Sequence, residues 1–215
     1  MARISASILA CDQTRLGAQV AQAKAAGIDY LHVDIMDGYY VANVAFGPQT
    51  VRDLHRVCPL PISVHFEVAH PDIYFPIFAD VGAEVITFQL DACPNPLHLL
   101  AEIKKLGIKA GIGIGPSYGL ERLPYLLPHM DWLVLMSGEP GYGGQKLDES
   151  IYGKLAQAKA MMAECGHTVP ISVDGGVNGQ NGADLVRAGA DILIAGSYLF
   201  GGDAISERVS QLKEL

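Results

Sequence analysis

The fold of this chain is decided by the stretch from Ala26 to Gly38, which reads AGIDYLHVDIMDG. Gly27 follows a segment with helical periodicity and can supply the left-handed backbone that ends a helix, and a short apolar, β-rich run comes next. The same stop-and-start signal recurs in the triplets VGA (81–83), LGI (106–108) and AGA (188–190). We therefore expect a chain of alternating helices and parallel strands.

Eight such β-rich runs are spread over the whole chain, with helical periodicity between them and no linker or low-complexity insert. This alternation predicts one (β/α)8 TIM barrel that occupies residues 1–215 as a single catalytic domain. A doubly wound open sheet is the alternative, but it usually has fewer strands. The predicted strands are Ile4–Leu9, Tyr30–Ile35, Ile62–Val68, Val85–Phe88, Ala110–Ile114, Trp132–Met136, Ile171–Asp174 and Ile192–Ala195. The clearest helices are predicted at Leu16–Ala26, Leu97–Leu106, Ile151–Cys165 and Ala183–Ala188, and the glycines predicted to end helices are Gly27, Gly82, Gly107, Gly166 and Gly189.

The composition excludes some classes of protein. The formal net charge is −8 over 215 residues, and no basic face is evident, which argues against a nucleic-acid partner. No apolar run approaches the length of a membrane span, so we expect a cytoplasmic protein without a membrane partner. The four cysteines form no CxxC pair and are typical of reduced thiols: Cys11, Cys58, Cys93 and Cys165.

Ionisable side chains stand where a TIM barrel carries its active site, at the carboxyl ends of predicted strands. His32 and Asp34 are two residues apart and point to one face, as do His65 and Glu67, and Asp174 ends a later strand. Each of them alone could be a hydrogen-bonded core residue or a helix cap. Burying several together is costly unless they bind a cation. We therefore predict a divalent metal held by His32, Asp34, His65 and Asp174, with Zn²⁺ or Fe²⁺ preferred and Mn²⁺ or Co²⁺ possible.

Two kinds of residue are left out of this predicted site. Asp37 precedes Gly38 and is expected to shape the loop that follows the strand. The other five histidines fall in helical or loop segments and are expected at the surface or in capping roles, although His70 follows the third strand closely enough to line the site: His55, His70, His98, His129 and His167.

Glycine-rich turns follow the last three predicted strands, in PGYGGQ (140–145), DGG (174–176) and AGS (195–197). Glycines let backbone N–H groups converge on an anion. One such turn is equally well explained as a tight loop without a ligand. Three neighbouring turns at this end of a barrel predict a phosphate site.

At this point the sequence resembles the ribulose-phosphate 3-epimerases over nearly its whole length. The runs that carry the resemblance are SIL (7–9), HVDIMDG (32–38), FGP (46–48), VH (64–65), PGYGGQK (140–146), VDGGV (173–177) and AGS (195–197). The resemblance implies an isomerase that interconverts D-ribulose 5-phosphate and D-xylulose 5-phosphate, works as a homo-oligomer and needs no organic cofactor. It supports the same four metal ligands and makes Asp34 and Asp174 the acid/base pair. The resemblance places nine residues around the substrate, and we add His65 and Glu67, which lie beside the metal. The full set is Ser7, Met36, His65, Glu67, Met136, Gly141, Gly144, Gly175, Gly176, Gly196 and Ser197.

The chemistry agrees with these implied roles. Epimerisation at C3 removes a proton next to a ketone and returns it to the other face, which needs acid/base groups on both sides of a planar enediolate. Asp34 and Asp174 come from strands that face each other across the barrel mouth. General acid–base transfer contributes roughly 10²–10⁴-fold to such a step.

The sequence departs from the family pattern at one position beside the metal. Glu67 replaces a usual methionine. It could bind the metal, bind a sugar hydroxyl or accept from a different substrate, or it could pair with a cation or orient His65. The other departures are interpreted as changes at the mouth, away from the proton-transfer centre: Ala42, Gln89, Gly115, Ser137, Gly138 and Glu139.

These departures keep two further hypotheses open. One is a 3-epimerase of another ketose phosphate, such as allulose 6-phosphate or a tetrulose phosphate. The other is a sugar-phosphate binding protein that has lost catalysis. The loops 39–46 and 138–146 are predicted to be mobile lids, because small residues and glycines permit motion.

Overall fold

Eight parallel strands form a closed barrel in the computed structural model, which describes residues 2–215. Each strand pairs with its neighbours in the ring order β1–β2–β4–β5–β6–β7–β8–β9, and the pairing of β9 with β1 closes the ring. The TIM-barrel prediction is confirmed. The barrel strands are β1 (Arg3–Ser7), β2 (Tyr30–Asp37), β4 (Ile62–Glu67), β5 (Val85–Gln89), β6 (Lys109–Ile114), β7 (Trp132–Met136), β8 (Ile171–Asp174) and β9 (Ile192–Ala195).

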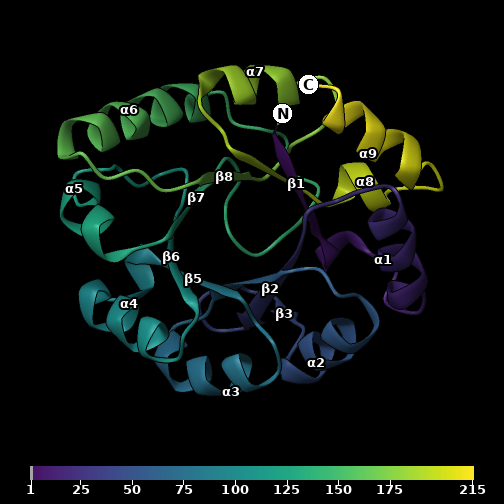
Figure 1. The fold of residues 1–215 in the computed structure, drawn as a ribbon, viewed down its shortest axis with the longest axis horizontal. Helices are drawn as coiled ribbons and strands as arrows, with labels where there is room; N and C mark the ends of the chain where they lie inside the picture. Colours follow the sequence, from purple (N-terminus) through teal and green to yellow (C-terminus); the bar gives the residue numbers. More distant parts are fainter. Residues whose placement is uncertain (1) are drawn as a thin grey trace.

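Helices surround this barrel on the outside (Figure 1). They are α1 (Leu16–Ala25), α2 (Pro48–Val57), α3 (Phe75–Asp80), α4 (Pro96–Lys105), α5 (Leu123–Leu126), α6 (Ser150–Cys165), α7 (Gly182–Ala188), α8 (Ser197–Phe200) and α9 (Ile205–Lys213). Short 3-10 turns are η1 (Ile8–Ala10), η2 (Pro71–Tyr74), η3 (Leu90–Ala92) and η4 (Leu127–His129). The five glycines predicted to end helices all have positive φ, between 69° and 120°. Within residues 2–215, no helix combines the length and the apolar character that crossing a membrane requires.

Side chains alternate between the two faces of the barrel wall. On β2, Leu31, Val33 and Ile35 belong to the main core between strands and helices, whereas the residues between them face the barrel interior. A smaller apolar cluster that includes Val85, Trp132 and Ile192 lies apart from the main core. This alternation directs the polar residues of β2, β4 and β8 toward the barrel axis.

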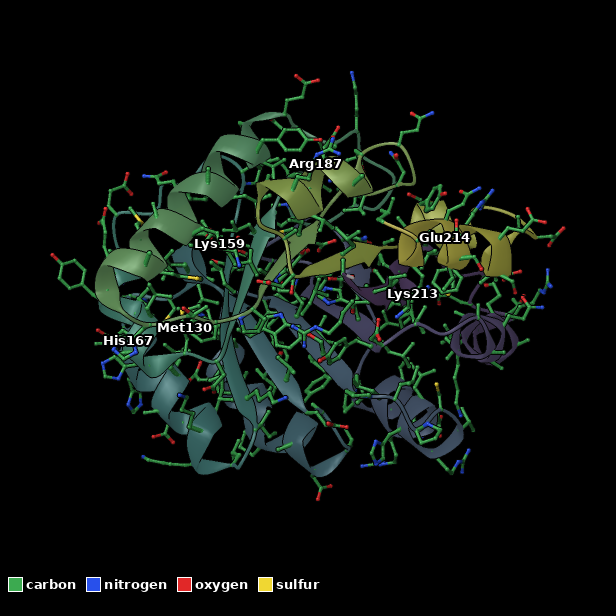
Figure 2. The ribbon with its side chains drawn as sticks, turned by 45° about the horizontal axis from the view of Figure 1, so that its top comes forward. Met130, Lys159, His167, Arg187, Lys213 and Glu214 are labelled. Atoms are coloured by element: carbon green, nitrogen blue, oxygen red, sulfur yellow. The ribbon has the colours of Figure 1, made fainter. Side chains whose placement is uncertain are left out.

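Three aspartates join the helices to the strand starts. Asp29, Asp131 and Asp191 immediately precede β2, β7 and β9, and each accepts a hydrogen bond from the backbone N–H of a residue on a neighbouring strand. Each also pairs with a lysine, at 2.6–3.0 Å, from Lys213, Lys104 and Lys159 respectively. Lys159 on α6 and Lys213 on α9 are labelled in Figure 2. This repeated contact was not predicted from the sequence.

The structure differs from the predicted strands at the barrel mouth. The first strand ends at Ser7 rather than Leu9, because Ser7 is the last residue of β1 that pairs with β2. The chain then turns through η1, where the Cys11 N–H donates to the Ile8 carbonyl at 3.0 Å. A two-residue strand, β3 (Val44–Ala45), pairs antiparallel with the end of β2 and was predicted as part of a loop.

Candidate metal centre and substrate cavity

Four ionisable side chains converge at the carboxyl ends of three strands. His32 and Asp34 come from β2, His65 from β4 and Asp174 from β8. One ligand atom from each of the four lies within 4.8 Å of all the others. The His32 Nε2 atom lies 3.0 Å from Asp34 Oδ1 and 3.8 Å from Asp174 Oδ2. The predicted ligand set is therefore brought together in space.

The donor atoms of this cluster suit a divalent metal. Both imidazoles are fully buried. Within the described part of the chain His65 Nδ1 makes no hydrogen bond, and it lies 3.4 Å from Asp34 Oδ1 and 3.9 Å from Asp174 Oδ2. An imidazole nitrogen binds a metal through its lone pair, so that lone pair must not already accept a hydrogen bond. His65 Nδ1 meets this condition and faces two carboxylates that could share the ion. Two nitrogens and two carboxylate oxygens form a set that borderline divalent ions bind. The cluster could hold one metal ion.

The two carboxylates have different electrostatic surroundings. Burial raises the pKa of Asp34, but the His32 and His65 imidazoles outweigh burial and hold that pKa well below its ordinary value. For Asp174, burial and the nearby Asp34 carboxylate prevail over the two imidazoles and raise its pKa. Burial lowers the pKa of His32, yet the Asp34 and Asp174 carboxylates raise it overall. Pairs of carboxyls with pKa values pushed apart are typical of acid/base sites.

Two neutral side chains hold members of the cluster. The Ser7 hydroxyl donates to Asp34 Oδ2 at 3.0 Å. The Gln89 side-chain amide lies 3.2 Å from His65 Nε2, where its oxygen can accept the Nε2 proton of an imidazole that binds metal through Nδ1, and Gln89 is completely buried. The prediction that Gln89 shapes only the mouth is therefore wrong. Gln89 was assigned to the loop because the predicted strand ended at Phe88, whereas β5 continues to Gln89 and turns this side chain into the barrel.

A glycine leaves room for this contact. An added Cβ at Gly113 on β6 would lie 2.8 Å from His65 Nε2 and 3.2 Å from Gln89 Oε1. Real Cβ atoms essentially never approach a heavy atom so closely. Gly113 thus leaves the space that His65 and Gln89 occupy, and it was not among the residues predicted for the site.

A cavity opens above the cluster at the barrel mouth. Asp34 and Asp174 reach its wall, whereas His32 and His65 are not among the residues that line it. Of the residues expected to surround the substrate, all except His65 line this cavity. They are Ser7, Met36, Glu67, Met136, Gly141, Gly144, Gly175, Gly176, Gly196 and Ser197. Lining residues that sequence reasoning missed include Leu9, Ala10, Tyr142, Val177 and Ile194.

The two loops predicted as lids contact each other over this cavity. Asn43 Nδ2 donates to the Gly141 carbonyl at 2.7 Å, and the Tyr142 hydroxyl donates to the Ala42 carbonyl at 2.7 Å. Gln145 Nε2 donates to the carbonyls of Glu139 and Tyr142 and so ties the second loop together. The contacts between the two loops join segments about 100 residues apart in the sequence. The mobility of these loops stays a prediction.

Glu67 is the unusual residue of the cavity wall. Its side chain is buried, with 2% of the residue exposed, and Oε2 has no hydrogen-bond partner among residues 2–215. Burial and the neighbouring Asp34 and Asp174 carboxylates raise the pKa of Glu67 to about 9, against a smaller lowering by the Gly141 N–H. The sequence correctly placed this carboxyl on the inner face beside His65.

The residues that were set aside lie outside the cluster. Asp37 accepts hydrogen bonds from the backbone N–H groups of Tyr39, Tyr40 and Ala69, so it shapes the loop as predicted. The other five histidines are exposed, and His167 lies at the outer edge of the molecule in Figure 2. Ser137 is buried and donates to the Gly175 carbonyl, which links the turns after β7 and β8.

Comparison with known proteins shows the family of this chain. A sequence model described as the Ribulose-phosphate 3 epimerase family matches residues 3–200. The chain belongs to the ribulose-phosphate 3-epimerase family. Ribulose-phosphate 3-epimerase of Escherichia coli (strain K12) is 39% identical over 92% of this chain and 88% of the relative. The Bacillus subtilis (strain 168) protein of the same name is 34% identical over 99% of each chain. The resemblance read from the sequence motifs is confirmed.

Solved structures confirm the fold of this family member. KGPDC from Streptococcus mutans superimposes with a TM-score of 0.76 at 13% identity, over all of this chain and 96% of the other. The 3-hexulose-6-phosphate synthase from Salmonella typhimurium gives 0.74 at 13% identity, over 99% and 97% of the two chains. At such identities the likeness concerns the barrel alone.

Proposed function

We propose that this chain is a metal-dependent 3-epimerase of a phosphorylated ketose, with D-ribulose 5-phosphate and D-xylulose 5-phosphate as its substrate pair. One observation carries the proposal above all. Asp34 and Asp174, from β2 and β8, meet a pair of buried imidazoles and both reach the wall of one cavity. A single catalytic domain, residues 1–215, contains the whole arrangement.

Proton transfer is the task of the two aspartates. With pKa values displaced in opposite directions, one carboxyl is ready to accept the C3 proton while the other is ready to donate. Because the groups come from separate strands, one can act on each face of a planar enediolate. The Ser7 hydroxyl orients Asp34 through its Oδ2 atom and leaves Oδ1 to the imidazoles.

The metal would be held by His32, Asp34, His65 and Asp174. When bound, a divalent ion supplies Lewis-acid stabilisation of the negative charge that develops on the substrate oxygens. Zn²⁺ or Fe²⁺ is our proposal for the ion, and Mn²⁺ or Co²⁺ also suits a mixed nitrogen and oxygen donor set.

The phosphate group is proposed to bind at the turns after β8 and β9. Gly175 and Gly176 have φ values of 102° and 64°, a left-handed backbone that glycine adopts without steric cost and that leaves the turn open beside the cavity. Gly196 and Ser197 follow on the neighbouring strand, and Gly141 and Gly144 lie in the loop across the cavity. Met36 and Met136 form apolar parts of the wall between these groups.

A substrate panel with metal control tests this function. We expect epimerisation of ribulose 5-phosphate that is lost after chelation and restored by a divalent ion. The altered residues Glu67 and Gly115 keep a second candidate, a 3-epimerase of allulose 6-phosphate or a tetrulose phosphate. Turnover of one of those compounds far above the pentulose phosphate would favour it. A chain that binds these sugars without exchanging the C3 proton would instead be a non-catalytic binding protein.

We further propose a cytoplasmic homo-oligomer with neither nucleic-acid nor membrane partners. Membership of the ribulose-phosphate 3-epimerase family is what supports self-association. Light scattering on the purified protein measures the oligomer, and a monomeric mass at working concentration would refute it.

A further inference from the structure

Glu67 lines the cavity and carries a buried hydrogen-bonding atom that nothing in the described chain satisfies. It is the last residue of β4, it lines the cavity, and its Oε2 atom is buried without a partner. A buried polar atom left unpaired is costly, so such an atom at the wall of a binding cavity points to a partner on the ligand.

Two other roles for this carboxyl find no support in the geometry. The ligand atoms that converge within 4.8 Å belong to the other four residues and exclude Glu67. Among residues 2–215, Glu67 takes part in no ion pair, and the nearby Tyr40 hydroxyl donates to Asp91 instead. The carboxyl therefore neither completes the metal cluster nor balances a cation.

The ring order shows which end of the substrate meets Glu67. Three strands separate β4 from β8 in either direction around the barrel, so the two strands lie diametrically opposite. The proposed phosphate site follows β8 and β9. A ketose phosphate anchored there, with C3 between Asp34 and Asp174, extends its other end toward β4. That end carries the hydroxyl of C1, next to the ketone.

We propose that Glu67 binds the C1 hydroxyl of the ketose phosphate and so makes the terminal hydroxymethyl group a requirement of this enzyme. This inference rests on the proposed function and adds the group by which the substrate is selected. A site built to hydrogen-bond a hydroxyl discriminates against an analogue that lacks it, because the buried polar group is then left unpaired. A hydrogen bond to a charged or strongly polar group gives about 10- to 100-fold discrimination.

The test compares D-xylulose 5-phosphate with 1-deoxy-D-xylulose 5-phosphate, which lacks only the C1 hydroxyl. The readout is kcat/KM for C3 deuterium exchange by the metal-loaded wild type, Glu67→Met and Glu67→Gln. We expect the wild type to prefer the hydroxylated compound by about 10- to 100-fold. Glu67→Met should reduce this preference to a few-fold and improve exchange of the deoxy compound, while Glu67→Gln should retain part of it because an amide can still bond a hydroxyl.

The outcomes separate this inference from the function beneath it. An unchanged preference in Glu67→Met, or no preference in the wild type, overturns the role of Glu67 and leaves the epimerase intact. Absence of exchange with both compounds in the wild type defeats the proposed function and this inference together. If Glu67→Met fails to fold, the smaller change to Gln decides, because it must weaken the preference.

Discussion

Replacing Glu67 should stabilise the metal-free protein, and the gain should grow with pH. Burial together with the Asp34 and Asp174 carboxylates raises the pKa of Glu67 from 4.5 to about 9. A carboxyl whose pKa is raised by folding favours the folded state most below its unfolded pKa. That contribution is lost as the pH rises from about 4.5 through 9. Between these limits the wild type loses about 1.4 kcal/mol per pH unit through this group.

The assay is urea unfolding of wild type, Glu67→Gln and Glu67→Met at pH 6 and pH 8 with a chelator present. Two pH units correspond to about 3 kcal/mol, so the advantage of each variant in unfolding free energy should increase by that amount. For a chain of this length the change equals a relative shift in Tm of about 6–12 °C. Glu84→Gln removes an exposed carboxylate and controls for the loss of one negative charge.

The refuting result is equally definite. If the stability difference between Glu67→Gln and wild type is the same at pH 6 and pH 8, the Glu67 carboxyl is not isolated from solvent and cations as described. A stability gain in Glu67→Met combined with a weaker C1 preference would show that this carboxyl serves binding at the expense of folding.

Three further predictions concern the metal centre. Gln89→Leu should weaken metal binding about 10- to 100-fold in a chelator competition, because His65 loses the side chain that orients it. Gln89→His should recover part of the lost affinity. Equal metal affinities in wild type and Gln89→Leu would contradict the positioning role of Gln89. Gly113→Ala should also weaken metal binding, since its Cβ would lie 2.8 Å from His65 Nε2, whereas Gly153→Ala on α6 has open space and should not. A divalent ion at about 100 times its wild-type Kd should raise the unfolding free energy of the wild type by about 2.7 kcal/mol. At the same ion concentration the gain in Asp174→Asn should be smaller. An equal gain in the variant would show that Asp174 is not a metal ligand.

The strands and the ligand cluster were predictable because each depends on a local pattern. Apolar, β-rich runs, several of them preceded by a helix-ending glycine, located every barrel strand to within about two residues. The spacing of two between His32 and Asp34, and between His65 and Glu67, determined which side chains share the inner face. Once the barrel is closed, strand ends that are distant in sequence must meet at the mouth.

Other parts of the site depend on contacts that no local pattern encodes. The bonds from Asn43 to Gly141 and from Tyr142 to Ala42 join two irregular loops, where side chains follow no period. The inward position of Gln89, in contrast, follows from a local pattern. Side chains alternate along a strand, so Gln89 shares the inner face of Val85 and Thr87 once the predicted strand is extended by one residue. The three aspartates before β2, β7 and β9 also gave a signal, as each directly precedes an apolar run.

The central claim, that Asp34 and Asp174 move the C3 proton on opposite faces, is tested most directly by isotope exchange in deuterium oxide. Wild type, Asp34→Asn and Asp174→Asn, each with its metal content verified, are incubated with D-ribulose 5-phosphate or D-xylulose 5-phosphate. We predict that each variant loses epimerisation by at least about 10²-fold but still exchanges the C3 proton of one epimer, a different epimer for each variant. Epimerisation near the wild-type rate in either variant would contradict the account.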